Sequence, residues 1–233
     1  MDIYTFDVVE STNDLARTHI IDRKSEPAAF VAKHQTMGRG RMGRVWKDEP
    51  GMNLLVSFAL PGNYYANPPL VGMAAAVFIG EYLESLGLSW EAKWPNDVLI
   101  NGKKVAGVLP EGIWQDTLQG IIVGIGLNVN QSEFPEEYPG TSIKEELQRE
   151  VALEQPLTYL AKRMEQIYNQ EVDYKTVVQV FKNRFALLGK QVKILSKDES
   201  WEGIASNIND DGSLLVAAGG KWININWGEV TLR

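Results

Sequence analysis

One short stretch of the chain, residues 35–46, alternates arginine with glycine. Guanidinium groups are planar forks of donors that suit phosphate and carboxylate oxygens, and glycine lets a backbone turn tightly and approach a ligand closely. The residues concerned are Gln35, Gly38, Arg39, Gly40, Arg41, Gly43, Arg44 and Trp46. Because the chain as a whole carries a formal net charge of −7, this stretch is a local concentration of positive charge. It predicts an anion-binding loop.

The glycine spacing also matches the G-x-G-x-x-G pattern of dinucleotide-binding folds, but the flanking sequence argues against that interpretation. A dinucleotide site needs a helix that opens at the last glycine and an acidic residue about 20 positions later. Here Pro50 and Gly51 form a turn signal shortly after Gly43, and no helical apolar period begins there. A solvated basic loop is the plain alternative, because arginine–glycine runs are often only soluble turns.

Two further groups of polar residues could bind a ligand or serve the fold alone. Ser11, Thr12 and Asn13 follow an alternating stretch and precede a helical one, so they either cap a helix or grip a polar ligand. Capping is the more common role and is favoured on the motif alone. Asn96 and Asp97 follow a proline at a corner between strands, where a plain turn is nearly as plausible as a nucleotide or magnesium contact.

The composition excludes several kinds of site. The 233 residues contain no cysteine, which excludes disulfides, thiolate nucleophiles and cysteine-bound metals. The two histidines, His19 and His34, have no metal-ligand spacing. The chain shows no signal peptide at its start and no stretch near the roughly 18 apolar residues of a membrane helix. Since the acidic balance also argues against nucleic acid, we expect a cytoplasmic protein with no DNA and no membrane partner.

Hydrophobic periodicity predicts a chain of mixed α and β structure. Strands are expected at residues 3–9, 28–34, 52–60, 89–94, 98–100, 103–111 and 118–128, with Leu54, Val56 and Phe58 on one face of the third. Helices are expected from about residue 12, at 68–86, from 142, from 156 and at 174–185. Asn101 and Gly102 predict a hairpin turn, and Gly87 predicts the end of the helix at 68–86. From about residue 189 short apolar runs alternate with turns, which predicts a small unit of about five strands.

Five motifs between about residue 10 and residue 130 carry a resemblance to a known family. They are Glu10-Ser-Thr-Asn13, which resembles E-S-T-N; Gly38-Arg-Gly-Arg-Met-Gly-Arg-Val-Trp46, which resembles G-R-G-R-x-x-R-x-W; Lys93-Trp-Pro-Asn-Asp97, which resembles K-W-P-N-D; Lys104-Val-Ala-Gly107-Val-Leu-Pro-Glu111, which resembles K-x-x-G-(I/V)-L-x-E; and Gly124-Ile-Gly-Leu-Asn-Val-Asn130, which resembles G-x-G-(I/L)-N-V-N. Each motif alone is modest evidence for the family, but five motifs in the family's order are specific evidence for it. The chain resembles a biotin–protein ligase, also called biotin–[acetyl-CoA-carboxylase] ligase, of the short type.

The resemblance implies an α/β fold of the α+β type. A mixed or mainly antiparallel central sheet has helices on one side, and a small SH3-like β-barrel follows it. The implied domains are residues 1–187 and 188–233. Because the chain starts directly at the first catalytic strand, no N-terminal winged helix-turn-helix and no repressor role are expected. Many members of the family pair as dimers through the sheet, so a homodimer is a further expectation. Pro110, within the fourth motif, cannot donate to a sheet ladder and predicts an edge or a bulge.

The implied reaction activates biotin with ATP, with Mg²⁺, to biotinyl-5′-AMP. A lysine of a biotin carboxyl carrier protein then takes the biotin and releases AMP. The nearest alternative is a lipoate or octanoate ligase or transferase of the same fold family, which resembles R-R-x-S-G-G-G-x-V-x-H where this chain has residues 38–46. A nucleic-acid-binding module built on the arginine–glycine loop is a less favoured alternative, because no basic stripe occurs elsewhere.

The resemblance also assigns roles to residues. Arg39, Arg41 and Lys104 are implied as catalytic residues at the carboxylate and the α-phosphate. The implied biotin-binding residues are Ser11, Thr12, Asn13, Gln35, Gly38, Arg39, Gly40, Arg41, Lys104 and Gly107. Those implied for ATP or the adenylate are Arg41, Arg44, Trp46, Asn96, Lys104 and Asn128, and Asp97 is implied for the metal. Gly107, Gly124 and Gly126 are expected to leave space for ligand. Trp46 has an alternative role as an aromatic side chain that only anchors the loop. Lys103, the neighbouring lysine, is the control for any substitution of Lys104.

Overall fold

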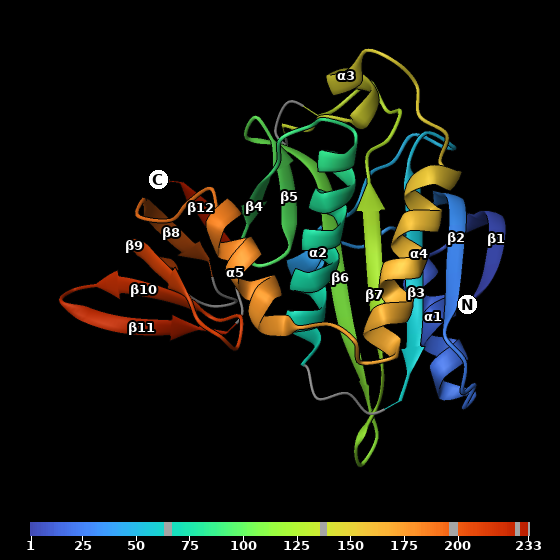
Figure 1. The fold of residues 1–233 in the computed structure, drawn as a ribbon, viewed down its shortest axis with the longest axis horizontal. Coiled ribbons are helices and arrows are strands. Elements are labelled where there is room, and N and C mark those ends of the chain that lie inside the picture. Colours follow the sequence, from blue (N-terminus) through green and yellow to red (C-terminus); the bar gives the residue numbers. More distant parts are fainter. Residues whose placement is uncertain (63–66, 136–138, 196–199, 227–228, 233) are drawn as a thin grey trace.

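The computed structural model describes residues 1–62, 67–135, 139–195, 200–226 and 229–232, which form two sheets with helices packed around the larger one (Figure 1). The larger sheet contains β1 (Asp2–Val9), β2 (Ala28–Gln35), β3 (Leu54–Pro61), β4 (Glu91–Lys93), β5 (Asp97–Ile100), β6 (Lys103–Trp114) and β7 (Leu118–Leu127). The smaller sheet contains β8 (Gln191–Leu195), β9 (Ser200–Ile208), β10 (Leu214–Ala218), β11 (Lys221–Ile225) and β12 (Glu229–Leu232). The helices are α1 (Thr12–Ile21), α2 (Pro68–Ser85), α3 (Ile143–Leu147), α4 (Glu154–Tyr168) and α5 (Tyr174–Arg184). Among the residues described, no helix has the length and apolar character needed to span a bilayer.

The pairing of the strands follows the prediction. The larger sheet is ordered β1-β2-β3-β7-β6-β5-β4 and the smaller one β11-β10-β9-β8-β12. In the larger sheet β1 pairs with β2 in parallel, whereas its other neighbours pair antiparallel. The smaller sheet is antiparallel throughout the described residues. A mixed, mainly antiparallel sheet followed by a small unit of five strands is therefore confirmed.

The helices lie on both faces of the larger sheet. Strand side chains alternate between faces, so Phe58 and Val123 belong to the core shared with α2, α4 and α5, while Ala59 and Ile122 pack with Ala16 of α1. In Figure 1, α2 and α4 lie in front of the sheet and α1 lies behind it. The expectation of helices on one side holds for α2, α4 and α5 and is wrong for α1.

Strand β3 lies inside the larger sheet, between β2 and β7. Its eight residues are all buried, because helices cover both of its faces. Leu54, Val56 and Phe58 share one face, as predicted, and this face packs against α2. Ser57 lies on the opposite face, where its hydroxyl contacts Thr12 at the start of α1. A polar residue in an otherwise apolar strand thus points toward the segment that precedes α1.

Local backbone features agree with the sequence patterns that predicted them. Asn101 and Gly102 have φ of 51° and 74°, which are the two positive values that a type I′ hairpin turn requires. Gly87 ends α2 at φ 81°. Pro110 pairs with Val123 of β7, and on its other side β5 reaches β6 only as far as Gly107 among the described residues. Pro110 therefore lies at a local sheet edge, as expected.

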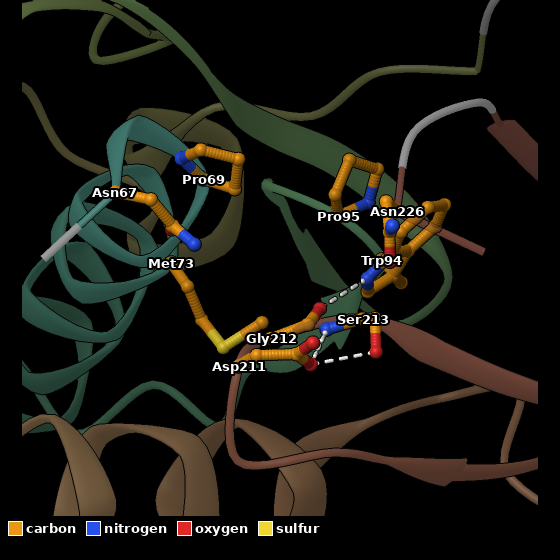
Figure 2. Close-up of a pocket in the computed structure, with 9 residues that line it drawn as sticks. All are labelled: Asn67, Pro69, Met73, Trp94, Pro95, Asp211, Gly212, Ser213 and Asn226. Atoms are coloured by element: carbon orange, nitrogen blue, oxygen red, sulfur yellow. Dashed lines mark hydrogen bonds between the residues drawn. The ribbon is translucent and has the colours of Figure 1, made fainter. Parts of the chain in front are cut away.

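The two sheets meet beside the N-terminus of α2, around a cavity of about 210 Å³ (Figure 2). The indole Nε1 of Trp94 donates a buried hydrogen bond of 2.9 Å to the carbonyl oxygen of Gly212 in the β9–β10 turn. Asp211 holds that turn by accepting from the backbone N–H of Ser213 at 2.9 Å and from its hydroxyl at 2.6 Å. The smaller sheet is thus fixed to the strand end that precedes Asp97.

Trp94→Phe should lower the free energy of unfolding by about 1–3 kcal/mol, because it leaves the buried Gly212 carbonyl without its donor. Urea denaturation followed by circular dichroism measures the loss. Trp90→Phe is a control, because it removes the same volume from an equally buried position. The indole of Trp90 donates to the part-buried carboxylate of Glu84 and not to a buried carbonyl. A loss for Trp94→Phe no larger than for Trp90→Phe would contradict the importance of this bond.

Candidate active site

A cavity of about 890 Å³ lies between the loop 35–46, the start of α1, strands β5 to β7 and the edge of the smaller sheet. Its wall includes every residue assigned to ligand binding except Gly38, namely Ser11, Thr12, Asn13, Gln35, Arg39, Gly40, Arg41, Arg44, Trp46, Asn96, Asp97, Lys104, Gly107 and Asn128. Lys190 and Val230 bring the second sheet into the same wall. Gly38 is buried at the base of the loop, where its carbonyl accepts from the backbone N–H of Trp46 at 2.9 Å.

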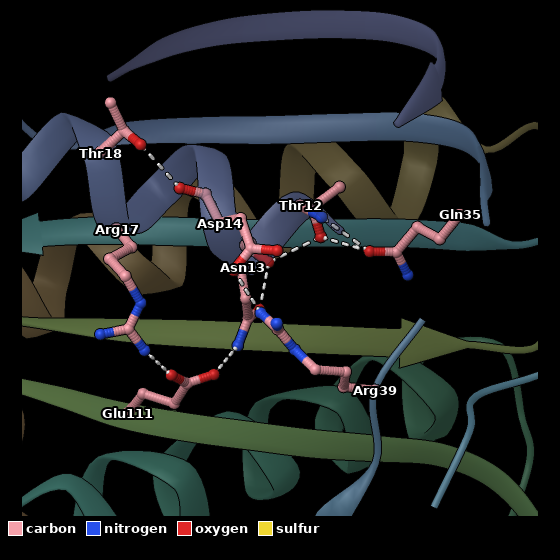
Figure 3. A network of polar contacts seen from close by, with 9 residues as sticks. Thr12, Asn13, Asp14, Arg17, Thr18, Gln35, Arg39 and Glu111 are labelled. Carbon is pink, nitrogen blue, oxygen red and sulfur yellow. Dashed lines mark hydrogen bonds and ion pairs between the residues drawn. The ribbon is translucent and has the colours of Figure 1, made fainter. Parts of the chain in front are cut away.

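The start of α1 supplies a buried network of neutral polar groups (Figure 3). The backbone N–H of Thr12 donates to Gln35 Oε1 at 2.7 Å, and the Thr12 hydroxyl lies 2.7 Å from that of Ser57. The Ser57 hydroxyl in turn donates to Asn13 Oδ1 at 2.5 Å. Ser11 occupies the N-cap position of α1 but makes no side-chain capping bond. The favoured role of this motif as a simple cap is therefore wrong, and its side chains line the cavity instead.

Charged residues surround this neutral network. Asn13 Nδ2 donates to Glu111 Oε1 at 2.6 Å, and Arg17 forms an ion pair with the other oxygen of the same carboxylate. Arg39 donates to Asp14 Oδ1 at 2.5 Å, and this bond raises the pKa of Arg39 above its ordinary value. The predicted cation Arg39 is thus turned toward α1 and held by an acidic partner.

A second cluster combines cations with one carboxylate. Lys104 Nζ donates to Asp97 Oδ1 at 2.7 Å and lies 5.4 Å from the centre of the Trp46 ring. Burial lowers the pKa of Arg41, with Asp97 opposing the shift and Arg44 adding to it. Burial likewise lowers the pKa of Lys93, which Asp97 opposes. The site therefore holds more positive charge than its own carboxylate balances, as expected for a site that takes up anions.

The arginine–glycine loop folds back on itself as a narrow hairpin. Arg39 and Val45 form a backbone bridge, and the N–H of Gly40 donates to the carbonyl of Arg44 at 2.7 Å. Met42 at the tip has φ 54° and its side chain is exposed. The loop therefore has a defined conformation in which Arg41 and Trp46 face the cavity.

The glycines of the cavity floor leave room for protein side chains. A Cβ at Gly124 would overlap the amide of Asn13, and one at Gly126 would overlap the indole of Trp46. A Cβ at Gly107 would lie 2.8 Å from Lys104 Nζ. The expectation that these three glycines leave space for ligand stays a prediction: all three line the cavity, and each one also admits a side chain that itself lines it.

Both predicted asparagines make bonds to the backbone in this structure. Asn128 Nδ2 donates to the carbonyls of Thr141 at 3.0 Å and Lys104 at 3.3 Å. Asn96 Nδ2 donates to the carbonyl of Val108, and Asn96 Oδ1 is buried with no partner among the described residues. The amide nitrogens thus fix strands β5 to β7 to their neighbours, and the Asn96 oxygen is the polar atom left for a ligand.

Sequence reasoning gave no role to three residues of this site. Ser57 could have been found as the polar residue in the apolar run 54–60. Glu111 and Lys93 belong to two of the five family motifs, but the resemblance assigned no role to either residue. The sequence does not show that Glu111 reaches Asn13, because strand β6 brings them together from positions 98 residues apart.

Gly126→Ala should lower the free energy of unfolding by about 1–3 kcal/mol, because its methyl would overlap the Trp46 indole and force a shift of the loop or the strand. Gly40→Ala is the matched control in the same cavity, since its Cβ would find its nearest atom at 3.5 Å, an ordinary contact. Chemical denaturation of both variants measures the difference. Equal stabilities would show that Trp46 does not need the space above Gly126.

Two protein-family models match the chain. The biotin/lipoate A/B protein ligase family matches residues 5–128, which include β2 to β7 in full and β1 from Thr5 onward. The biotin protein ligase C-terminal domain matches residues 187–233, which include the smaller sheet. Together the two models account for both sheets that form the cavity wall.

Named relatives and solved structures agree with these models. The chain is 31% identical over 219 residues to the bifunctional ligase/repressor BirA of Bacillus subtilis, covering 90% of this chain and 67% of the relative. It is 30% identical to the biotin–[acetyl-CoA-carboxylase] ligase of Paracoccus denitrificans, covering 82% and 85%. The biotin protein ligase of Aquifex aeolicus in complex with biotin and ATP superposes with a TM-score of 0.82 at 29% identity, covering 100% of this chain and 98% of that one. The chain therefore belongs to the biotin/lipoate A/B protein ligase family and carries the biotin protein ligase C-terminal domain.

Proposed function

We propose that this chain is an ATP-dependent biotin–protein ligase, which forms biotinyl-5′-AMP and transfers biotin to a specific lysine of a biotin carboxyl carrier protein. The observation that carries the proposal is one cavity in which neutral hydrogen-bonding groups and fixed cations occur together. Thr12 and Gln35 supply neutral groups of the kind that a ureido ring needs. Arg41 and Lys104 supply the positive charge that two approaching anions need.

Three buried polar atoms of the cavity wall support ligand binding there. Arg41 Nη1, Trp46 Nε1 and Asn96 Oδ1 are buried and have no hydrogen-bond partner among the described residues. Buried polar groups in folded proteins are nearly always bonded, so partners for these atoms are expected from a bound molecule. Two of them donate and one accepts, which fits a ligand with both anionic oxygens and N–H groups.

The first step joins two anions. A carboxylate oxygen of biotin attacks the α-phosphorus of ATP, and pyrophosphate leaves with the electron pair of the broken phosphoanhydride bond. Arg41, Lys104 and Arg39 are the groups that we assign to the developing negative charge. Asp97 already holds the Lys104 ammonium in place, so this cation needs little reorganisation when the charge develops.

The second step releases AMP. The lysine amine of the carrier attacks the carbonyl carbon of the mixed anhydride, an amide bond forms, AMP leaves with the electrons of the C–O bond, and the amine gives one proton to solvent. Neither step needs a nucleophile from the protein. Because the anhydride is hydrolysable, the hairpin loop over the cavity would protect it from water.

The remaining assignments follow the positions in the cavity wall. Groups near the start of α1 and the loop base are assigned to biotin: Ser11, Thr12, Asn13, Gln35, Gly38, Gly40 and Gly107. Groups near the cation cluster are assigned to the nucleotide: Arg44, Trp46, Asn96 and Asn128. For Gly38 the support is indirect, since it shapes the base of the loop without lining the cavity.

Magnesium fits this site only when it is bound to the phosphates of the nucleotide. The described residues contain no group of three or more histidine, aspartate or glutamate side chains placed to hold a metal ion. Asp97, the assigned ligand, already accepts from Lys104. Mg²⁺ usually keeps several waters and binds through one or two carboxylates plus substrate phosphates. We therefore assign to Mg²⁺ the neutralisation of ATP phosphates and to Asp97 at most one contact with it.

Further expectations concern organisation and partners. Residues 1–187 are assigned to catalysis and 188–233 to an SH3-like unit, in keeping with the two sheets. Strand β1 is an edge strand with exposed Ile3, Tyr4 and Val8, which is compatible with a homodimer through the sheet. The acidic net charge supports a role that needs no DNA, and we place the activity in the cytoplasm.

Transfer of biotin to a purified carrier domain tests the function. With ATP, mass spectrometry should detect one biotinyl group on the carrier lysine, and a carrier whose acceptor lysine is changed to arginine should gain none. Lipoate offered in place of biotin in ATP–pyrophosphate exchange should give no signal above background. Exchange with lipoate and not with biotin would replace this proposal by the lipoate alternative.

A further inference from the structure

Polar and charged groups beside α1 form one continuous chain of hydrogen bonds (Figure 3). It runs through Arg17, Glu111, Asn13, Ser57, Thr12 and Gln35. We propose that Glu111 and Ser57 are positioning residues that fix the direction of the side-chain bonds from Asn13 to Thr12. As a result Thr12 presents an acceptor to the cavity, beside the donor of Gln35, which the Thr12 backbone orients. The inference rests on the proposed function only in taking the ligand to be the cyclic urea of biotin.

The direction is set at one end by an ion pair. Arginine has no acceptor, and an ionised carboxylate has no donor, so Arg17 can only donate to Glu111. The other oxygen of Glu111 accepts from Asn13 at 2.6 Å. That oxygen needs an N–H, which places the amide nitrogen of Asn13 toward Glu111. Asn13 Oδ1 therefore points toward Ser57.

The hydroxyl groups then have one arrangement. Asn13 Oδ1 can only accept, so Ser57 gives it its single proton across 2.5 Å. Ser57 can therefore only accept from Thr12, whose hydroxyl lies 2.7 Å away. Thr12 also has Gln35 Oε1 at 3.1 Å, but its single proton goes to the nearer Ser57. The lone pairs of Thr12 Oγ1 are left as acceptors.

The other end of the chain is set by the backbone. The N–H of Thr12 can only donate, and it lies 2.7 Å from the side-chain oxygen of Gln35. Gln35 Oε1 is held there, so its Nε2 turns away from Thr12, as Figure 3 shows. The cavity wall thus offers a hydroxyl acceptor beside an amide donor. A cyclic urea has N–H donors beside a carbonyl acceptor, which is the complementary pattern.

The strand opposite Ser57 leaves room for this arrangement. Gly124 pairs with Ser57 in the sheet, and a Cβ at Gly124 would overlap the Asn13 amide. Because Ser57, Asn13 and Thr12 are all buried, water does not compete for their bonds. Reversing the chain would bring the Asn13 N–H toward Ser57 and turn the Thr12 proton toward Gln35.

Glu111→Gln tests the direction of the chain. A glutamine has one side-chain oxygen, for which Arg17 and Asn13 must compete, so Asn13 is expected to turn over. The KM for biotin in ATP–pyrophosphate exchange should rise about tenfold or more, the size expected when a buried bond is lost and its partner stays unpaired. The KM for ATP should stay within about twofold. Ser57→Ala should show the same split, because it interrupts the chain.

A second substitution separates positioning from damage to the fold. Arg17→Met added to Glu111→Gln removes the competitor, so the glutamine oxygen returns to Asn13 and the KM for biotin should recover toward the unmodified value. Glu81→Gln is the matched control, because Glu81 likewise accepts from an arginine, Arg163, and from a neutral donor, the Tyr159 hydroxyl. It lies between α2 and α4, and its KM values should not change.

The outcomes distinguish this inference from the proposed function. If the unmodified chain gives no exchange with biotin, the proposed function fails. If it gives exchange and Glu111→Gln leaves the KM for biotin unchanged, or raises the KM for ATP equally, the inference is overturned. A double variant that is no better than Glu111→Gln alone also overturns it, because a general loss of structure would not be repaired by removing Arg17.

Discussion

Lys104→Ala should slow formation of the adenylate about a hundredfold, the usual effect of losing one pre-aimed cation at a developing charge. Lys104 is held by Asp97 at 2.7 Å and lies over the Trp46 ring, so its ammonium has a fixed position before any ligand arrives. The substitution also leaves the Asp97 carboxylate facing the phosphates without its counter-charge. Both effects raise the barrier for joining two anions.

Lys103→Ala is the control for this prediction. Lys103 is the neighbouring residue, but its side chain is exposed and it is absent from the cavity wall. Its removal changes the net charge by the same amount and should leave the rate within about twofold. Single-turnover formation of biotinyl-AMP measures both variants. Similar rates for the two would show that general positive charge, and no particular ammonium, assists the reaction.

The sequence was sufficient where a local signal decides the structure. Asn101 and Gly102 predicted a turn with two positive φ values, and Gly87 predicted the end of a helix, because few other residues adopt these conformations at low cost. The alternation of Leu54, Val56 and Phe58 predicted that these three side chains share one face of β3, which is confirmed. In each case the cause lies within a few neighbouring residues.

The rest depends on contacts between distant segments. The helical pattern after residue 12 does not reveal which face of the sheet α1 covers. The packing of α1 side chains against β2, β3 and β7 decides the face. The roles of Gly124 and Gly126 were also inaccessible, because Asn13 and Trp46 reach them from elsewhere in the chain. The motifs contain residues that line one cavity, but the motifs do not show which of these residues touch one another.

Arg41→Gly should allow biotinyl-AMP to leave the site about a hundredfold faster. Arg41 is partly buried, and its Nη1 has no hydrogen-bond partner among the described residues, whereas Arg39 is already bonded to Asp14. A charge-assisted bond to a ligand oxygen is typically worth about 1.5–3 kcal/mol, and most changes in affinity for related ligands appear in the dissociation rate. Arg41, whose Nη1 has no hydrogen-bond partner among the described residues, should therefore contribute more to retention than Arg39, which is bonded to Asp14.

Rapid filtration of pre-formed enzyme–adenylate complex measures the release, and Arg23→Gly is a suitable control because Arg23 is exposed and lies outside the cavity wall.

Arg39→Gly should accelerate release less than Arg41→Gly, since it also frees Asp14 from its ion pair and leaves the Arg41 contact intact. A greater effect for Arg39→Gly would mean that the ion pair with Asp14 opens on binding and that Arg39 becomes the main contact. Release at the unmodified rate from Arg41→Gly would remove Arg41 from the groups that hold the intermediate, and the cation cluster would then reduce to Arg44, Lys93 and Lys104.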